Sequence, residues 1–321
     1  MTIVIPGGTG QVGTLLARAF HRDGHEVIVL GRSPGPAAWR VRRWDPANPA
    51  GWSHMLDGAD VVINLAGRSV NCRYNRTNRR EILDSRVDSV RAVAAAVADA
   101  KRPPRVWLQA STATIYAHRF DAPNDESSGV IGGSEADAPD TWRFSIDVAT
   151  AWEKAIDDAV VPFTRKVKLR SAVTLSPDPG GIFDTLLMLV RRGLGGAAGS
   201  GRQYLSWIHE FDFIRAVYFL IARSDIDGAV NLASPNPLPN REFMTVLRRA
   251  WGTSIGLPAS GWMLEIGAVL LQTETELILK SRRVIPGRLL REGFTFTYAE
   301  WPDAARELCE RWRALRPAAA A

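Results

Sequence analysis

The stretch IPGGTGQVG, residues 5–13, sets three glycines three positions apart: Gly7, Gly10 and Gly13. A short apolar run precedes it, and apolar residues at helical spacing follow it. Glycines at a strand-to-helix turn let the backbone approach a pyrophosphate closely, and the first amides of the helix point at its charge. The stretch therefore predicts a dinucleotide-binding turn with a helix that opens at Gln11.

Strand and helix patterns alternate beyond this turn. The segments HEVIVLGR, RVRRWD, ADVVINLAG, RVWLQAST and RKVKLRSAVTL are typical of strands, and helical spacing recurs over residues 77–100 and 142–155. Such alternation indicates a parallel sheet covered on both faces. We expect an α/β fold, a Rossmann-type doubly wound parallel sheet over residues 1–176. A smaller C-terminal substrate-binding part over 177–321 would return some elements, such as AVNLAS, to that sheet.

Bulk composition narrows the class of protein. The chain has 321 residues, of which 46% are hydrophobic and 23% charged, an ordinary globular composition. The net charge of +6 comes from basic residues spread along the chain, so we expect an anionic cofactor and no nucleic acid. Cys72 and Cys309 lie far apart, which argues against a metal site and is typical of a cytoplasmic protein. The apolar window 262–281 contains several glutamates, so we expect a buried or interface helix and no membrane span.

The end of the second predicted strand bears on cofactor choice. An acidic side chain there would bind the ribose 2′-hydroxyl of NAD, but the sequence has Arg32 and Ser33 after Gly31. An arginine pairs with a 2′-phosphate and a serine donates to it. NADP is therefore the expected cofactor, with a solvated loop arginine as the alternative reading of Arg32.

Further motifs support a family resemblance. NLAG (64–67), STATIY (111–116) and LRSAV (169–173) follow the glycine turn in the order of the extended short-chain dehydrogenase/reductase superfamily. NRREILDSRVDSVR, GSGRQYLSWIHEFD and LKSRRVIPGRLLREGFTF resemble its atypical epimerase-like subgroup, the NAD-dependent epimerase/dehydratase-like proteins with their own C-terminal segment. The resemblance extends from residue 1 to about residue 311.

This resemblance implies a set of cofactor contacts. They follow the cofactor from the pyrophosphate, past the adenosine ribose and adenine, to the nicotinamide. They are Gly7, Gly10, Gln11, Val12 and Gly13 along the pyrophosphate, Arg32 and Ser33 at the ribose, Asp45 at the adenine amino group, Leu65, Ala66 and Gly67 around adenine and ribose, and Ser171, Ala172 and Val173 at the nicotinamide.

Catalysis departs from the family pattern. The family uses a Ser or Thr to orient the substrate oxygen, a Tyr as acid and base, and a Lys four residues later that lowers the pKa of the Tyr. Thr112 matches the orienting hydroxyl, although a strand-end threonine bonded to backbone is the alternative. In WRFSIDVATAWEKA, Ser145 stands at the Tyr position and Ala149 at the Lys position, and no Tyr occurs between Tyr116 and Tyr204. Proton chemistry must therefore come from elsewhere in the pocket.

Candidates for that role and for substrate contact remain open. The catalytic candidates are Thr112, Tyr116 and Ser145, with Asp147 as a further polar group. The candidates for substrate binding are Arg143, Arg202, Gln203, Trp207 and His209. The long acidic segment 117–142 is a predicted lid, with a solvated loop as the alternative.

Three functions fit these expectations. The first is an NADP(H)-dependent oxidoreductase that acts on a small carbonyl or hydroxyl substrate. The alternatives are a nucleotide-sugar epimerase or dehydratase-like enzyme, and a non-catalytic NADP-sensing protein. A homodimer is expected by analogy with the superfamily.

Overall fold

The computed structural model describes residues 1–135, 139–259, 274 and 276–316. Most of the apolar window 262–281, predicted as a buried helix, lies outside these residues. None of the helices in the described part is long and apolar enough to cross a membrane.

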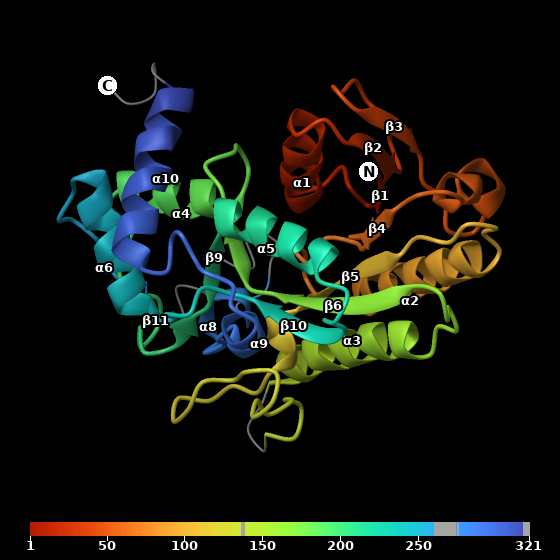
Figure 1. Cartoon of the computed structure of the whole chain (residues 1–321). Coiled ribbons are helices and arrows are strands. Elements are labelled where there is room, and N and C mark those ends of the chain that lie inside the picture. Colours follow the sequence, from red (N-terminus) through yellow and green to blue (C-terminus); the bar gives the residue numbers. More distant parts are fainter. Residues whose placement is uncertain (136–138, 260–273, 275, 317–321) are drawn as a thin grey trace.

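One sheet of seven parallel strands organises the chain, in the order β10–β6–β5–β4–β1–β2–β3 (Figure 1). The strand order reverses between β1 and β4, which is where α/β sheets of this type bind dinucleotides. This confirms the predicted Rossmann-type fold. The strands are β1 Thr2–Pro6, β2 Glu26–Gly31, β3 Arg40–Arg43, β4 Val61–Asn64, β5 Val106–Thr112, β6 Arg165–Ser171 and β10 Gly228–Leu232.

Helices cover both faces of the sheet. Helices α1 (Gln11–Arg22) and α5 (Glu210–Ala222) lie on one face, and α2 (Arg76–Ala98) and α3 (Asp140–Asp157) lie on the other (Figure 1). The central strands are apolar and buried along their length because both of their faces are covered.

The segment RKVKLRSAVTL departs from the predicted single strand. Its first part is β6, but β7 (Val173–Leu175) leaves the sheet and pairs with β9 (Trp207–His209). Between them the Ala172 amide donates to Leu232 O of β10 at 3.0 Å, where β10 ends beside β6. The chain therefore turns away from the sheet directly after Ser171.

The C-terminal part has a hydrophobic core of its own, in which the Trp301 ring stacks on Phe243 at 4.0 Å. Asn240 opens α6, and its side chain accepts a hydrogen bond from the Ala198 amide. The other elements are the short 3-10 helices η1 Pro49–Gly51, η2 Ser53–Leu56 and η3 Ala113–Ile115, strands β8 Tyr204–Leu205 and β11 Leu238–Pro239, and helices α4 Ile182–Arg191, α6 Asn240–Trp251, α8 Glu276–Leu279, α9 Gly287–Arg291 and α10 Trp301–Leu315.

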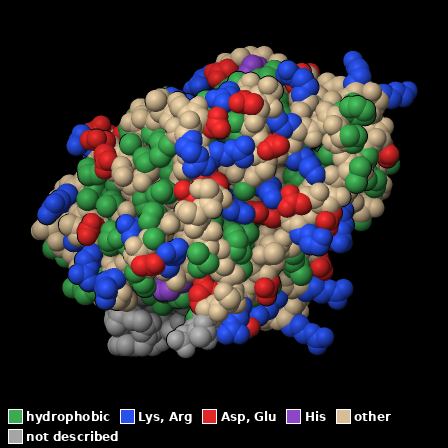
Figure 2. Space-filling model, turned by 60° about the horizontal axis from the view of Figure 1, so that its bottom comes forward, with side chains coloured by type: hydrophobic (Ala, Val, Ile, Leu, Met, Phe, Trp, Pro, Cys, Tyr) green, Lys and Arg blue, Asp and Glu red, His purple; other side chains and the backbone are tan. Residues whose placement is uncertain are grey.

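Charged side chains of both signs are interspersed on the face shown in Figure 2. Many charged side chains of the described residues form ion pairs, such as Lys154–Asp158 at 2.8 Å and Arg119–Asp121 at 2.6 Å. Much of the positive charge is therefore locally compensated.

Candidate functional site

A cavity of about 700 Å³ lies at the carboxyl ends of β1, β2 and β4. It contains seven of the predicted cofactor contacts: Gly7, Gly10, Arg32, Asp45, Leu65, Ala66 and Gly67. The other lining residues are Thr9, Gly31, Arg43, Trp44, Pro46, Arg68, Ser69 and Ser85.

The three glycines of the turn serve different needs. Gly7 has a φ of +73°, and a Cβ on it would lie 2.5 Å from Ala66 Cα, so close backbone packing requires this glycine. A Cβ on Gly13 would lie 2.4 Å from Gly8 Cα, so close backbone packing requires a glycine at this position too. A Cβ on Gly10 would meet only Gly7 O, at 3.9 Å. Gly10 therefore leaves open space at the start of α1, where an approaching pyrophosphate would lie.

Polar groups around this turn suit an anionic dinucleotide. The Gln11 side-chain amide nitrogen is buried and makes no hydrogen bond with the described residues. Arg32 and Arg43 line the cavity, and neither makes an ion pair with a described residue. The register of β2 and β3 places Arg43 beside Gly31, so the two arginines flank the same corner. The residues present therefore fit NADP, with the arginines as its 2′-phosphate site.

The remaining predicted cofactor contacts do not line this cavity. Gln11, Val12 and Gly13 belong to α1, and Ser33 follows Arg32 on an exposed loop. Ser171 ends β6, Ala172 follows it, and Val173 begins β7.

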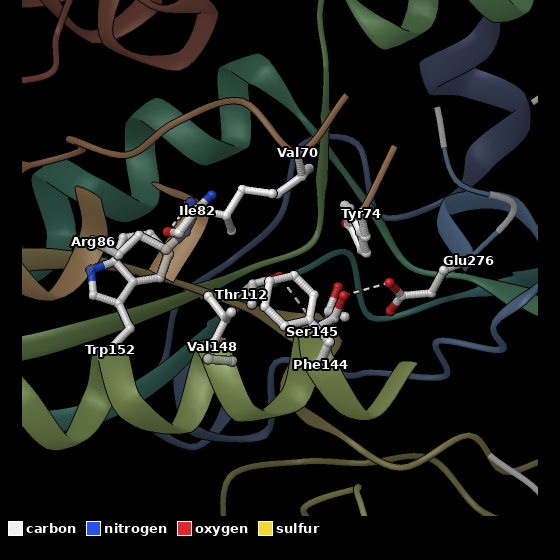
Figure 3. A pocket seen from close by; sticks show the side chains of 12 residues that line it. Val70, Tyr74, Ile82, Arg86, Thr112, Phe144, Ser145, Val148, Trp152 and Glu276 are labelled. Atoms are coloured by element: carbon white, nitrogen blue, oxygen red, sulfur yellow. Dashed lines mark hydrogen bonds between the residues drawn. The ribbon is translucent and has the colours of Figure 1, made fainter. Parts of the chain in front are cut away.

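A second, smaller cavity of about 130 Å³ lies between β5, α2, α3 and the C-terminal segment. Arg86 and Trp152 are at one end, Tyr74 and Glu276 at the other, and Thr112 and Ser145 between them (Figure 3). The cavity is lined by Val70, Tyr74, Ile82, Arg86, Thr112, Thr114, Phe144, Ser145, Val148, Ala149, Trp152 and Glu276.

The two cavities adjoin at Arg86. A Cβ on Gly67, in the larger cavity, would lie 3.3 Å from Arg86 Cζ. Arg86 donates to the carbonyls of Arg68 and Ile82, and its guanidinium lies 5.0 Å from the centre of the Trp152 ring. Burial lowers the pKa of Arg86 to about 10, and the described residues offer it no carboxylate partner. The smaller cavity therefore contains the positive charge of Arg86 without a carboxylate among the described residues that pairs with it.

Thr112 and Ser145 line the smaller cavity, as expected for site residues. Thr112 ends β5 and pairs in register with Ser171 of β6. Its Oγ1 accepts the Thr114 amide at 3.1 Å, so the backbone-bonded reading of this residue also holds. That bond leaves the hydroxyl proton of Thr112 available to a substrate oxygen.

Ser145 belongs to a chain of polar side chains. Its hydroxyl donates to a carboxylate oxygen of Glu276 in α8. It also lies near enough to the phenol of Tyr74 to influence the pKa of that group. Burial raises the pKa of Tyr74 to about 12, and burial also raises the pKa of Glu276. Both groups are therefore held in their protonated forms more strongly than in water.

Tyr116 does not reach either cavity, so we withdraw it as a catalytic candidate. Its hydroxyl donates to Asn231 Oδ1 at 3.0 Å and accepts from Arg170 at 2.9 Å, behind the sheet edge. Arg170 also pairs with Glu153 at 2.8 Å. This buried network ties β6, α3 and β10 together and is structural.

The predicted substrate contacts also lie elsewhere. His209 caps α5, accepts the Phe211 amide and pairs with Glu307 at 2.8 Å. Trp207 is fully buried and Gln203 bonds the Ala198 carbonyl. Arg202 is exposed beside Phe120, and Arg143 and Asp147 are exposed on the outer face of α3. Capping and packing therefore engage His209, Trp207 and Gln203, whereas the three charged residues face solvent.

The predicted lid is fastened to the C-terminal segment. The Asn124 amide donates to Arg283 O at 2.7 Å, and the carboxylate of Glu126 accepts the amides of Asn231 and Arg288. None of the described residues between 117 and 142 lines the smaller cavity. A lid role has no support in this arrangement.

Four residues of the two cavities were not predicted from the sequence: Arg43, Tyr74, Arg86 and Glu276. The cavity-facing position of Arg43 could have been predicted from the alternation of side chains along β3, because Val41 and Arg43 share a face. The other three come from segments that only the folded chain brings together.

Comparison with known proteins agrees with this arrangement. Residues 3–132 match the model of the NAD dependent epimerase/dehydratase family, and residues 259–308 match a domain of unknown function, DUF1731. The human epimerase family protein SDR39U1 is 31% identical over 96% of this chain and 99% of its own length. This chain belongs to the NAD-dependent epimerase/dehydratase family. The resemblance read from the motifs is thereby confirmed.

Two solved structures extend the comparison. Human epimerase family protein SDR39U1 (isoform 2), solved with NADPH, has a TM-score of 0.84 at 30% identity and covers 97% of this chain and 99% of its own. A nucleoside-diphosphate sugar epimerase from Corynebacterium glutamicum has a TM-score of 0.74 at 31% identity. It matches 97% of this chain, which spans 58% of that longer protein.

Proposed function

We propose that this epimerase-family protein is an NADPH-dependent reductase of a small carbonyl compound. The observation that carries the proposal is the junction at Arg86, where the larger cavity, shaped for a dinucleotide, adjoins a small cavity lined by hydroxyl groups. The NADPH bound in the related human structure supports the choice of cofactor.

The cofactor would supply a hydride, and the residues of the chain would do the rest. Arg32 and Arg43 would hold the 2′-phosphate, and the amides at the start of α1 the pyrophosphate. The hydroxyl of Thr112 would donate a hydrogen bond to the substrate oxygen and so orient the carbonyl. The apolar walls, which include Val148 and Trp152, would exclude water.

The size of the smaller cavity favours a small substrate. Its volume of about 130 Å³ is well below the roughly 300 Å³ at which pockets for drug-sized ligands begin. A nucleotide sugar is larger than such a ligand. An epimerase remains the second candidate because a relative of 31% identity carries that name.

Turnover tests the proposal directly. The purified protein is mixed with NADPH and a panel of small aldehydes, ketones and 2-oxo acids, and NADPH oxidation is followed by absorbance. We expect oxidation with at least one carbonyl. Thr112→Val should lower kcat about 100-fold. Thr150→Val makes the same change at an exposed position of α3 and should leave kcat unchanged. Tight NADPH binding without oxidation across the panel would favour the sensing role, and interconversion of UDP-sugars would favour the epimerase.

A further inference from the structure

The smaller cavity needs a proton donor that α3 does not supply. Position 145 is a serine and position 149 an alanine, where the family pattern has tyrosine and lysine. Among the side chains that line the cavity, the ionisable ones are Tyr74, Arg86 and Glu276. The donor should therefore be sought among these three.

We propose that the phenol of Tyr74 protonates the substrate oxygen and replaces the tyrosine absent from α3. This assignment rests on the reductase function proposed above. Tyr74 precedes α2 and reaches the cavity from the opposite wall to α3 (Figure 3). Tyr74 and Ser145, the residue at the family tyrosine position, line the same cavity, and Ser145 lies near enough to the phenol to influence its pKa. The phenol oxygen therefore enters the cavity near the place that the missing side chain would occupy.

The backbone and the ring of Tyr74 are both fixed by contacts with neighbouring residues. Its amide donates to Glu274 at 2.6 Å, and its carbonyl accepts from Arg79 at 2.8 Å. Its ring packs edge-on against Phe144 with 5.1 Å between ring centres. A donor fixed in this way needs little reorganisation when the substrate binds.

The other two groups are poorer donors. The guanidinium of Arg86 donates to the carbonyls of Arg68 and Ile82 and lies at the other end of the cavity from Ser145 and Glu276, so no relay reaches it. Glu276 has a fully buried carboxylate, with one oxygen engaged by Ser145 and the other 3.7 Å from Arg282. Glu276 therefore holds the Ser145 hydroxyl and can return a proton to it.

The proton balance closes through this chain. When the carbonyl carbon is reduced, the oxygen takes the Tyr74 proton and becomes a hydroxyl. The Ser145 hydroxyl, which donates to Glu276 in the resting site, turns to the phenolate and gives it a proton, and Ser145 takes a proton from protonated Glu276. Glu276 recovers its proton from solvent, so each turnover consumes one carbonyl, one NADPH and one proton.

Three variants test the assignment with the carbonyl that the wild type reduces best. Tyr74→Phe should lower kcat by about 100-fold or more while KM and NADPH affinity change little. Ser145→Ala and Glu276→Gln should lower kcat by smaller factors. The matched control is Tyr218→Phe, because Tyr218 is a partly buried tyrosine whose hydroxyl donates to Asp23 but which lies between α5 and α1, away from the cavity. Wild-type turnover with full activity in Tyr74→Phe would overturn the assignment, whereas an inactive wild type would overturn the proposed function instead.

A second readout needs no turnover. The chain has five tyrosines, so [13C]ζ-tyrosine labelling gives five NMR signals, and Tyr74→Phe identifies one of them. That signal should keep its phenol chemical shift until the pH nears 12, and it should move in Ser145→Ala and in Glu276→Gln. A signal that ignores both variants would show that the relay does not exist. The charged and titratable groups that influence this phenol are Cys72, Arg86, Glu274, Glu276 and Arg282.

Discussion

At the level of single residues, glycines of one motif are required for different reasons. Gly7 and Gly13 are demanded by the protein's own backbone, at Ala66 and Gly8. Gly10 faces open space, so only a ligand gives it a reason to lack a side chain. The motif alone predicts a cofactor turn but does not separate these two uses.

This difference predicts opposite outcomes for two alanine substitutions. Gly10→Ala should cost less than about 1 kcal/mol of stability, the scale of a helix-cap change, yet weaken NADPH binding at least about tenfold. Gly13→Ala should destabilise the fold by about 1–3 kcal/mol through overpacking. Urea unfolding and fluorescence titration measure both quantities. Equal losses of affinity and stability in the two variants would contradict this reading.

Lys280 predicts a stability change with pH. Its side chain is 1% exposed and donates to Thr114 O at 2.8 Å, and burial lowers its pKa to about 8. The unfolded chain keeps that proton to about pH 10.5, so between pH 8 and 10.5 the unfolded state binds more protons and stability rises with pH.

The comparison with Lys280→Met isolates this effect. The free energy of unfolding of the wild type relative to the variant should rise by on the order of 3 kcal/mol between pH 7 and pH 11. Denaturation at a series of pH values measures the difference. A difference that stays constant over this range would show that the Lys280 ammonium is not desolvated in the native protein.

At the level of elements, α3 keeps its packing and loses its chemistry. Ile146, Val148, Trp152 and Ile156 are buried at helical spacing, as its apolar stripe predicts. Ser145 brings a hydroxyl group and Trp152 an indole N–H to the cavity from this helix, and Ser145 links to Glu276 of another element.

Strand β3 offers a matched pair for cofactor specificity. Successive side chains of a strand point to opposite faces, so Arg43 lines the cofactor cavity and Arg42 does not. Arg43→Ala should weaken NADPH binding about tenfold or more, the effect of one charge-assisted hydrogen bond of ~1.5 kcal/mol, with little change for NADH. Arg42→Ala removes the same charge and should change neither. Isothermal titration of both cofactors decides, and equal losses in the two variants would mean that only net charge matters.

At the level of the whole molecule, the smaller cavity is assembled from four distant parts of the chain. Tyr74 precedes α2, Thr112 ends β5, Ser145 lies on α3, and Glu276 belongs to the C-terminal segment matched by the domain of unknown function. That segment also binds the 117–135 loop, so it closes the site from the side opposite the cofactor cavity.

The amino-acid sequence by itself determined the sheet, the glycine turn and seven of the residues that line the cofactor cavity. These features depend on periodicity and on residues close together in the chain, where local backbone geometry carries the information. It also showed that α3 lacks its tyrosine and lysine. Only the tertiary structure decided what faces the smaller cavity, because long-range packing brings Tyr74 and Glu276 to Ser145 and draws Tyr116 and His209 into buried hydrogen bonds elsewhere.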